Sequence, residues 1–113
     1  PAKRPTLTDL VDAVAYVADL VGDTEHVGIG TDHGEDAYTR DQWECAWGAR
    51  GLYPSVTGTL GEWYGFDTRS VQGMESISCF PRLTEALLTR GFSDSAVLGI
   101  LGANFMRLFG EVW

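Results

Sequence analysis

The sequence contains little positive charge and no long apolar run. Eight Lys and Arg residues stand against sixteen Asp and Glu residues, so the formal net charge is −8 at pH 7. No basic patch stands out, and nucleic acid is therefore not an expected partner. The apolar runs are far shorter than the ~20 residues that a membrane span needs. The 113 residues, of which 44% are hydrophobic, suffice for one small core.

Cysteine is also scarce, because Cys45 and Cys79 are the only two in the sequence. They allow at most one disulfide, and neither belongs to a Cys-x-x-Cys pair, which argues against a structural zinc site built on thiolates. We expect both thiols to be free, as in a reducing compartment. No signal peptide precedes the first polar helix start, and the sequence therefore predicts a cytoplasmic protein. The chain begins at Pro1 without an initiator Met, which predicts either an internal segment of a larger protein or a processed product.

Residues 6–22 have the pattern of an amphipathic helix. Thr6 and Asp9 have the spacing of a capping box, and Gly22 is a natural C-terminal stop. Apolar side chains recur at spacings of three and four residues, which predicts a buried stripe. The predicted stripe consists of Leu10, Val14, Val17 and Val21, and Val11 and Leu20 widen it.

The stretch from His26 to Asp32, HVGIGTD, is the most informative part of the chain. Its β-branched residues and glycines predict a short buried strand over residues 26–31 that ends at an acid. With a helical pattern on either side, the strand fits one unit of a βα barrel, where acids at strand ends carry chemistry. The alternative is that Asp32 only caps a turn.

Residues 33–78 show no sustained period, because glycines and aromatics interrupt it repeatedly. The aromatic content argues against disorder, and we predict an ordered loop or lid inserted after the strand. Within it, the pattern favours a helical turn over 39–47 and, more weakly, a hairpin over 56–63.

Residues 82–113 are predicted to form the C-terminal helices. Gly91 ends the first, Ser93 caps the second, and Gly102 interrupts the apolar pattern. Near this interruption we expect the amide of Asn104 to satisfy backbone groups at the helix junction. The predicted fold class is α/β, a helix–strand–helix portion of a TIM-like barrel with a long insertion after the strand.

Three motifs resemble those of the membrane (renal-type) dipeptidases. Residues 81–93 (PRLTEALLTRGFS) are similar to the family pattern P-x-L-T-x-x-L-L-x-R-G-[FY]-S. Residues 100–107 (ILGANFMR) resemble I-L-G-x-N-[FL]-[LM]-R, and residues 26–32 resemble H-V-G-I-G-[ST]-D. The motifs occur in the family order and, with the helix before the strand, cover roughly two-thirds of the chain. The resemblance is missing across 33–77.

This resemblance implies a metal-dependent hydrolase of the amidohydrolase superfamily, with two bridged zinc ions and dipeptide substrates. The family's zinc ligands, a His-x-Asp pair, a bridging Glu and two further His, are expected before Pro1, because this chain contains no His-x-Asp. We therefore expect no metal ligand here. The resemblance assigns only Asp32 a catalytic role, in which it contacts the substrate's amino end and handles a proton. His33 is either a further substrate contact or a solvent-facing loop residue.

One departure from the family leaves the function open. The family continues D-F-D-G where this chain has Asp32-His33-Gly34-Glu35. A zinc-dependent dipeptidase is expected. The alternatives are an amidohydrolase acting on another small amide, and a non-catalytic barrel remnant used for assembly or binding. The expected partners are the rest of the barrel, a dipeptide or small amide, and identical subunits. The isolated chain is expected to be inactive.

Overall fold

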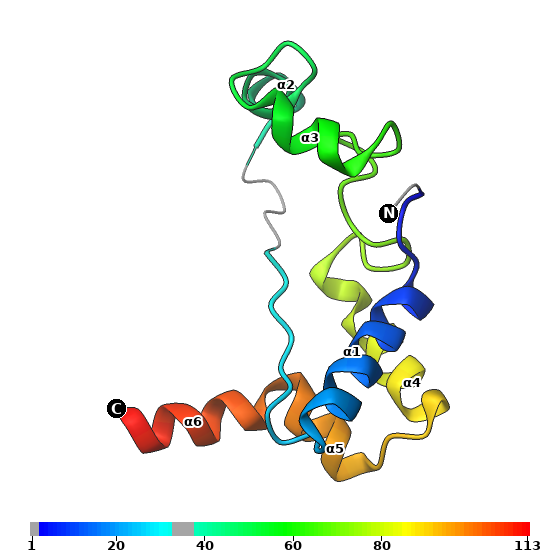
Figure 1. Cartoon of the computed structure of the whole chain (residues 1–113), viewed down its shortest axis with the longest axis vertical. Coiled ribbons are helices and arrows are strands. Elements are labelled where there is room, and N and C mark those ends of the chain that lie inside the picture. The colour runs from blue at the N-terminus through cyan, green and yellow to red at the C-terminus, as the bar shows by residue number, and fades with distance from the viewer. Residues whose placement is uncertain (1–2, 33–37) are drawn as a thin grey trace.

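The structure, a computed structural model, describes residues 3–32 and 38–113, and this part of the chain is helical (Figure 1). The elements in chain order are α1 (Leu7–Val21), α2 (Arg40–Trp47), α3 (Pro54–Leu60), the 3₁₀ turn η1 (Ile77–Cys79), α4 (Phe80–Arg90), α5 (Asp94–Leu98), the π-helical η2 (Gly99–Ala103) and α6 (Asn104–Val112). Figure 1 shows α1, α4, α5 and α6 at one end, which we call the helical lobe. Residues 38–68, with α2 and α3, form the aromatic lobe at the other end. The radius of gyration of 16.2 Å exceeds the about 13 Å of a compact domain of this length, as expected for two lobes.

The predicted α/β fold class is wrong, because the described residues contain no β-strand. The segment predicted as a strand, residues 26–31, runs as an extended trace beside the helical lobe (Figure 1). An extended segment becomes a strand only when a neighbouring segment takes up its backbone groups in a ladder. No described segment does so, and the β-pairing found in these ranges is one isolated parallel bridge between Thr6 and Gln72. The residue pattern indicated an extended course but carried no information on a partner.

The predicted start and end of the first helix are confirmed. The Thr6 amide donates to Asp9 Oδ2 at 2.7 Å, and the Asp9 amide donates to Thr6 Oγ1 at 3.3 Å, completing a capping box. Gly22 ends α1 in the left-handed region, with φ 88°, and its amide donates to the Ala18 carbonyl. Both signals are local, so the sequence alone was sufficient to place them.

The buried face of α1 matches the predicted stripe only in part, at Val11 and Val14. Val11, Val14 and Ala18 are buried, whereas Val17 and Val21 are 40% and 48% exposed. Apolar residues occupy more than one face of α1, and the period of the pattern does not say which face meets a partner. Packing against α4 determines which face of α1 is buried.

The core lies in the helical lobe, between α1 and the C-terminal helices. Leu83 and Leu87 are one helical turn apart on α4, and Ile100 lies in η2; all three side chains are fully buried. They pack in one cluster with buried side chains of α1, the extended segment, the stretch between the aromatic lobe and η1, and α5 (Val11, Val14, Ala18, Val27, Met74 and Val97). Val27 thus contributes to the fold through its side chain, although its segment is not a strand.

The C-terminal helices also follow the predicted signals. Gly91 ends α4 with φ 104°, the Ser93 side chain accepts from the Ala96 amide, and Gly102 has non-helical dihedrals. Residues Asp94–Val112 nevertheless form one helical run of 19 residues with a mean hydropathy of 1.2, of which 11% is buried. By length and composition alone this run can cross a membrane, contrary to the estimate from apolar runs. One such helix is a weak indication, because core helices of soluble proteins meet the same criteria.

Asn104 fastens α6 to the loop that follows α1. Its Nδ2 donates to the Thr24 carbonyl at 2.7 Å and to the Val27 carbonyl at 2.8 Å, as expected for a polar side chain at the junction. Arg107 adds a bond from Nη2 to the Glu25 carbonyl at 2.9 Å. Together these contacts set the starting point of the extended segment.

Replacing Asn104 by Ala is expected to lower the free energy of unfolding by about 1–2 kcal/mol, because two backbone carbonyls lose their donor. Urea denaturation of the complete protein measures the change. Thr89→Ala, at an exposed position of α4, is the control and is expected to have little effect. Equal effects of the two substitutions would contradict the structural role of Asn104.

The aromatic lobe is built around Trp43, which is 4% exposed. Its ring lies 6.3 Å from that of Trp47, 5.8 Å from Tyr64 and 6.2 Å from Phe66, centroid to centroid. The helical turn predicted over 39–47 is confirmed as α2. The hairpin predicted over 56–63 is wrong, because Pro54 begins helix α3 there. Proline suits the first turn of a helix, a signal that outweighed the weak alternation of this segment.

The two thiols are free, as predicted. Cys45 is exposed on α2, and Cys79 is half-buried in η1.

Candidate functional site

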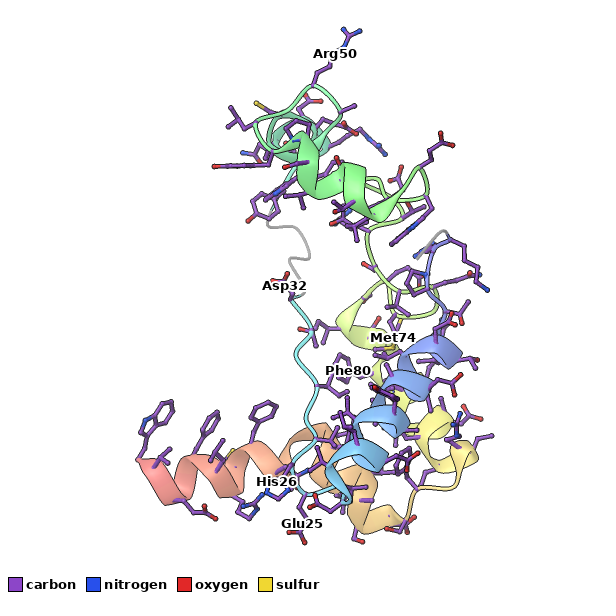
Figure 2. All side chains as sticks on the ribbon, in the orientation of Figure 1. Glu25, His26, Asp32, Arg50, Met74 and Phe80 are labelled. Atoms are coloured by element: carbon purple, nitrogen blue, oxygen red, sulfur yellow. The ribbon has the colours of Figure 1, made fainter. Side chains whose placement is uncertain are left out.

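A cavity of about 270 Å³ lies along the extended segment, between the two lobes. Figure 2 shows Met74 and Phe80 on the side of this segment that faces α1, with Asp32 farther along it toward the aromatic lobe. Apolar side chains form one part of the wall (Leu10, Ile29, Val71, Met74 and Phe80). Polar and charged residues line the remainder (Thr31, Asp32, Tyr64, Arg69, Ser70 and Glu75). A small cavity that combines an apolar wall with a few charged groups is typical of a small-molecule site.

Asp32, the predicted catalytic residue, lines this cavity and is exposed. Among the described residues, Asp32 is the one non-glycine residue with a positive φ, at 46°. Aspartate tolerates this left-handed conformation better than most residues, because its short side chain bonds locally. Such outliers cluster at functional sites, so the backbone at Asp32 is consistent with a site residue. Its function as a catalytic or substrate-binding group stays a prediction.

Arg69 brings a positive charge to the same cavity from the aromatic lobe's side. Its guanidinium stacks over the Phe66 ring, 4.3 Å from the centroid, and Nη1 donates to the Phe66 carbonyl. Arg40 also stacks on the Phe66 ring, 4.8 Å from the centroid, and forms an ion pair with Asp67 at 2.6 Å. In the ion pairs of the described residues, Arg69 has no carboxylate partner.

The second acid of the cavity, Glu75, is already neutralised by the protein. The Gly73 amide donates to Glu75 Oε1 at 2.9 Å, and Arg4 Nη2 lies 3.0 Å from the same oxygen. The Gly73 hydrogen bond, assisted by the Arg4 charge, lowers the pKa of Glu75. Arg4 also donates from Nε to the Ser70 carbonyl, which fixes the loop that follows Arg69.

The described residues do not provide a metal site. They contain no cluster of three or more His, Cys, Asp or Glu side chains able to hold an ion. His26 lies away from the cavity, where its Nδ1 is 2.9 Å from Asp23 Oδ1, and this hydrogen bond lowers the pKa of Asp23. His33, predicted as a second substrate contact, lies outside the described residues.

Sequence reasoning missed Arg69, Glu75 and Tyr64. They come from a stretch without periodicity, and nothing local places them near Asp32. One signal was present for Arg69: it is the single basic residue between Arg50 and Arg82 in an otherwise acidic and aromatic stretch.

Comparisons with known proteins identify the family of this chain. Residues 55–113, more than half of the chain, match the family model described as membrane dipeptidase (peptidase family M19). The match begins at residue 55, so it includes part of the stretch where the sequence motifs showed no resemblance. The chain belongs to the membrane dipeptidase family.

Individual relatives agree with this assignment. The chain is 28% identical over 113 residues to "Dipeptidase aclJ" of Aspergillus oryzae, covering 98% of this chain and 19% of that protein. It is 30% identical over 111 residues to "Dipeptidase verJ" of Clonostachys rogersoniana, covering 98% and 20%. Mouse "Dipeptidase 3" is 38% identical over 53 residues, 47% of this chain and 11% of that protein. The chain thus spans about a fifth of the length of the fungal relatives. No solved structure gives a significant match.

Proposed function

We propose that this chain forms part of a zinc-dependent dipeptidase, in which Asp32 binds the ammonium group of a dipeptide. The observation that carries the proposal is the exposed Asp32 carboxylate on the wall of a 270 Å³ cavity in a chain of the dipeptidase family. A cavity of this size lies near the lower end of the range for small-molecule sites, which favours a small substrate.

The charge of Asp32 suits this role. No ion pair among the described residues involves Asp32, so its carboxylate is available to a cationic ligand. A charge-assisted hydrogen bond between an ammonium group and a carboxylate would orient the substrate. When the peptide bond breaks, the leaving amine must gain a proton, and a carboxyl group at this position can carry one.

Zinc belongs to the proposal for the complete enzyme only. The described residues do not fit a zinc ion on their own, and its ligands would lie in parts of the enzyme outside them. When bound there, zinc would lower the pKa of a water molecule and so supply the nucleophile. The contribution of this chain is the binding of substrate charge, and we expect the isolated chain to be inactive.

The test uses the complete enzyme and alanyl-alanine as substrate. We expect amine release that stops after dialysis against EDTA and returns when zinc is added. Hydrolysis that survives chelation would contradict the metal dependence. N-acetylalanine and alaninamide, offered in parallel, separate a dipeptidase from an enzyme for other small amides. Hydrolysis of none of these compounds would favour the non-catalytic alternative and overturn the proposal.

A further inference from the structure

A second cavity, of about 600 Å³, lies within the aromatic lobe, where α2 and α3 contact each other. Figure 1 shows these two helices at the end of the molecule away from the helical lobe. The volume of the cavity falls in the range of small-molecule sites. Among the described residues, Tyr64 lines both this cavity and the one beside Asp32. The two cavities therefore adjoin, but their walls have different chemistry.

Aromatic rings form part of the wall of the second cavity, at Trp43, Trp47 and Tyr64. The plane of Trp43 is inclined by 44° to that of Trp47 and by 51° to that of Tyr64, so the three rings are not stacked flat. Tyr38 packs edge-on against Trp47 at 5.1 Å, and Trp63 packs edge-on against Tyr64 at 5.5 Å. These outer rings support the wall, and a wall fixed before binding loses less conformational entropy when a ligand arrives.

Two exposed carboxylates, those of Glu44 on α2 and Glu62 after α3, line the same cavity. The described lining residues include no Lys or Arg, and no ion pair of the described residues involves either acid. Arg40, one turn before Glu44, is paired with Asp67 at 2.6 Å, and Asp67 raises the pKa of Arg40 more than Glu44 does. The cavity therefore carries negative charge, and a cleft lined by one sign of charge concentrates ions of the opposite sign.

We propose that this cavity binds an organic cation that carries a quaternary ammonium group. The face of an aromatic ring is negative, so tilted Trp and Tyr rings attract a cation that holds its own water weakly. The carboxylates of Glu44 and Glu62 supply the counter-charge at the same wall. A metal ion fits less well, because the described residues contain no cluster of three or more His, Cys, Asp or Glu that could hold one. The net charge of −8 favours the approach of cations in general.

The experiment compares choline with dimethylbutanol, its neutral isostere, in which a carbon atom replaces the charged nitrogen. The methyl protons of either compound give a single NMR signal, which broadens when the compound binds to the complete enzyme. Titration is expected to show that choline binds about 10-fold more tightly than the isostere, because only choline has a charge for the rings and carboxylates to attract. Equal affinities would mean that the cavity selects shape alone and would overturn the proposal.

Two substitutions test the two parts of the wall. Trp47→Leu keeps an apolar side chain but removes the ring, and is expected to raise the dissociation constant of choline about 3- to 30-fold. Its control is Tyr53→Leu, which removes an exposed ring of the same lobe that does not line the cavity. Glu44→Gln is expected to raise the dissociation constant about 3- to 10-fold. Its control is Asp41→Asn, at an exposed position of α2 that does not line the cavity.

Both controls are expected to bind choline as wild type does. Near-ultraviolet circular dichroism of each variant checks that the aromatic lobe is intact. Asp32→Asn is also expected to keep the affinity for choline, because Asp32 lines the other cavity. Loss of choline binding in Asp32→Asn, with no change in Trp47→Leu and Glu44→Gln, would place the cation beside Asp32 and overturn the proposal.

Direct binding also separates this inference from the proposed dipeptidase function, because no turnover is measured. Choline binding that depends on Trp47 and Glu44 supports the cation site even if the complete enzyme hydrolyses no dipeptide. Hydrolysis of alanyl-alanine by an enzyme that does not bind choline would support the dipeptidase function and overturn the cation site. The latter result is expected if a basic side chain from outside this chain fills the cavity in the complete enzyme.

Discussion

Asp32→Asn in the complete enzyme is expected to reduce kcat/KM for dipeptides by about 10²- to 10⁴-fold, the range of acid–base and charge contributions. Asparagine has nearly the same shape and also tolerates the left-handed backbone found at φ 46°, so the change removes charge and proton transfer while sparing the backbone. Steady-state kinetics with alanyl-alanine measures the loss. Metal analysis of the purified variant is expected to show unchanged zinc content.

The matched control is Asp19→Asn, which removes the same charge from an exposed position on α1 that does not line the cavity. Its turnover is expected to equal that of wild type. Near-normal turnover by Asp32→Asn would show that the acid has no direct part in the reaction. A loss of zinc from this variant would instead indicate that Asp32 acts through the metal site.

Leu87→Ala is expected to lower the free energy of unfolding by about 2–5 kcal/mol, the cost of a large-to-small change at a fully buried position. The loss is large here because few side chains make up the core of the helical lobe and three of them are fully buried. A small core gives a small free energy of unfolding, so a cavity left by one substitution removes a large share of it. Urea denaturation, followed by circular dichroism, measures the change.

The adjacent residue gives a close control. Leu88 has the same side chain on the same helix but is 42% exposed. Leu88→Ala is expected to change the free energy of unfolding by less than about 0.5 kcal/mol, as for most surface positions. Similar losses at the two positions would mean that Leu88 is buried in the complete enzyme against residues outside this chain.

The parts of the fold that the sequence predicted correctly depend on neighbours in the chain. The Thr6 capping box and the glycine stops at Gly22 and Gly91 involve contacts within a few residues, so their patterns were sufficient. The errors concern choices made at long range. Whether Val17 or Ala18 turns inward depends on α4, and whether residues 26–31 form a strand depends on a partner segment.

The candidate site divides in the same way. Asp32 was singled out because a distinctive extended motif ends at it, and the structure places it at a cavity, although its role stays a prediction. Arg69 and Glu75 reach that cavity through the path of the chain around the aromatic lobe, which no local pattern encodes. An acid with an obvious motif was therefore found, while the basic residue at the same cavity was not.

The bonds from Asn104 to the Thr24 and Val27 carbonyls have a consequence for the timing of biosynthesis. The ribosome makes the acceptor loop first, and its donor follows 80 residues after Thr24 and 77 after Val27. At a synthesis rate of about 5–20 residues per second, Asn104 is added roughly 4–16 s after the segment leading to Asp32, and its two hydrogen bonds cannot form before then. The core partners of α1 on α4 arrive almost as late. During that interval the apolar face of α1 has no partner from α4 to α6, so we expect chaperones that bind exposed apolar segments to associate with this part of the emerging chain.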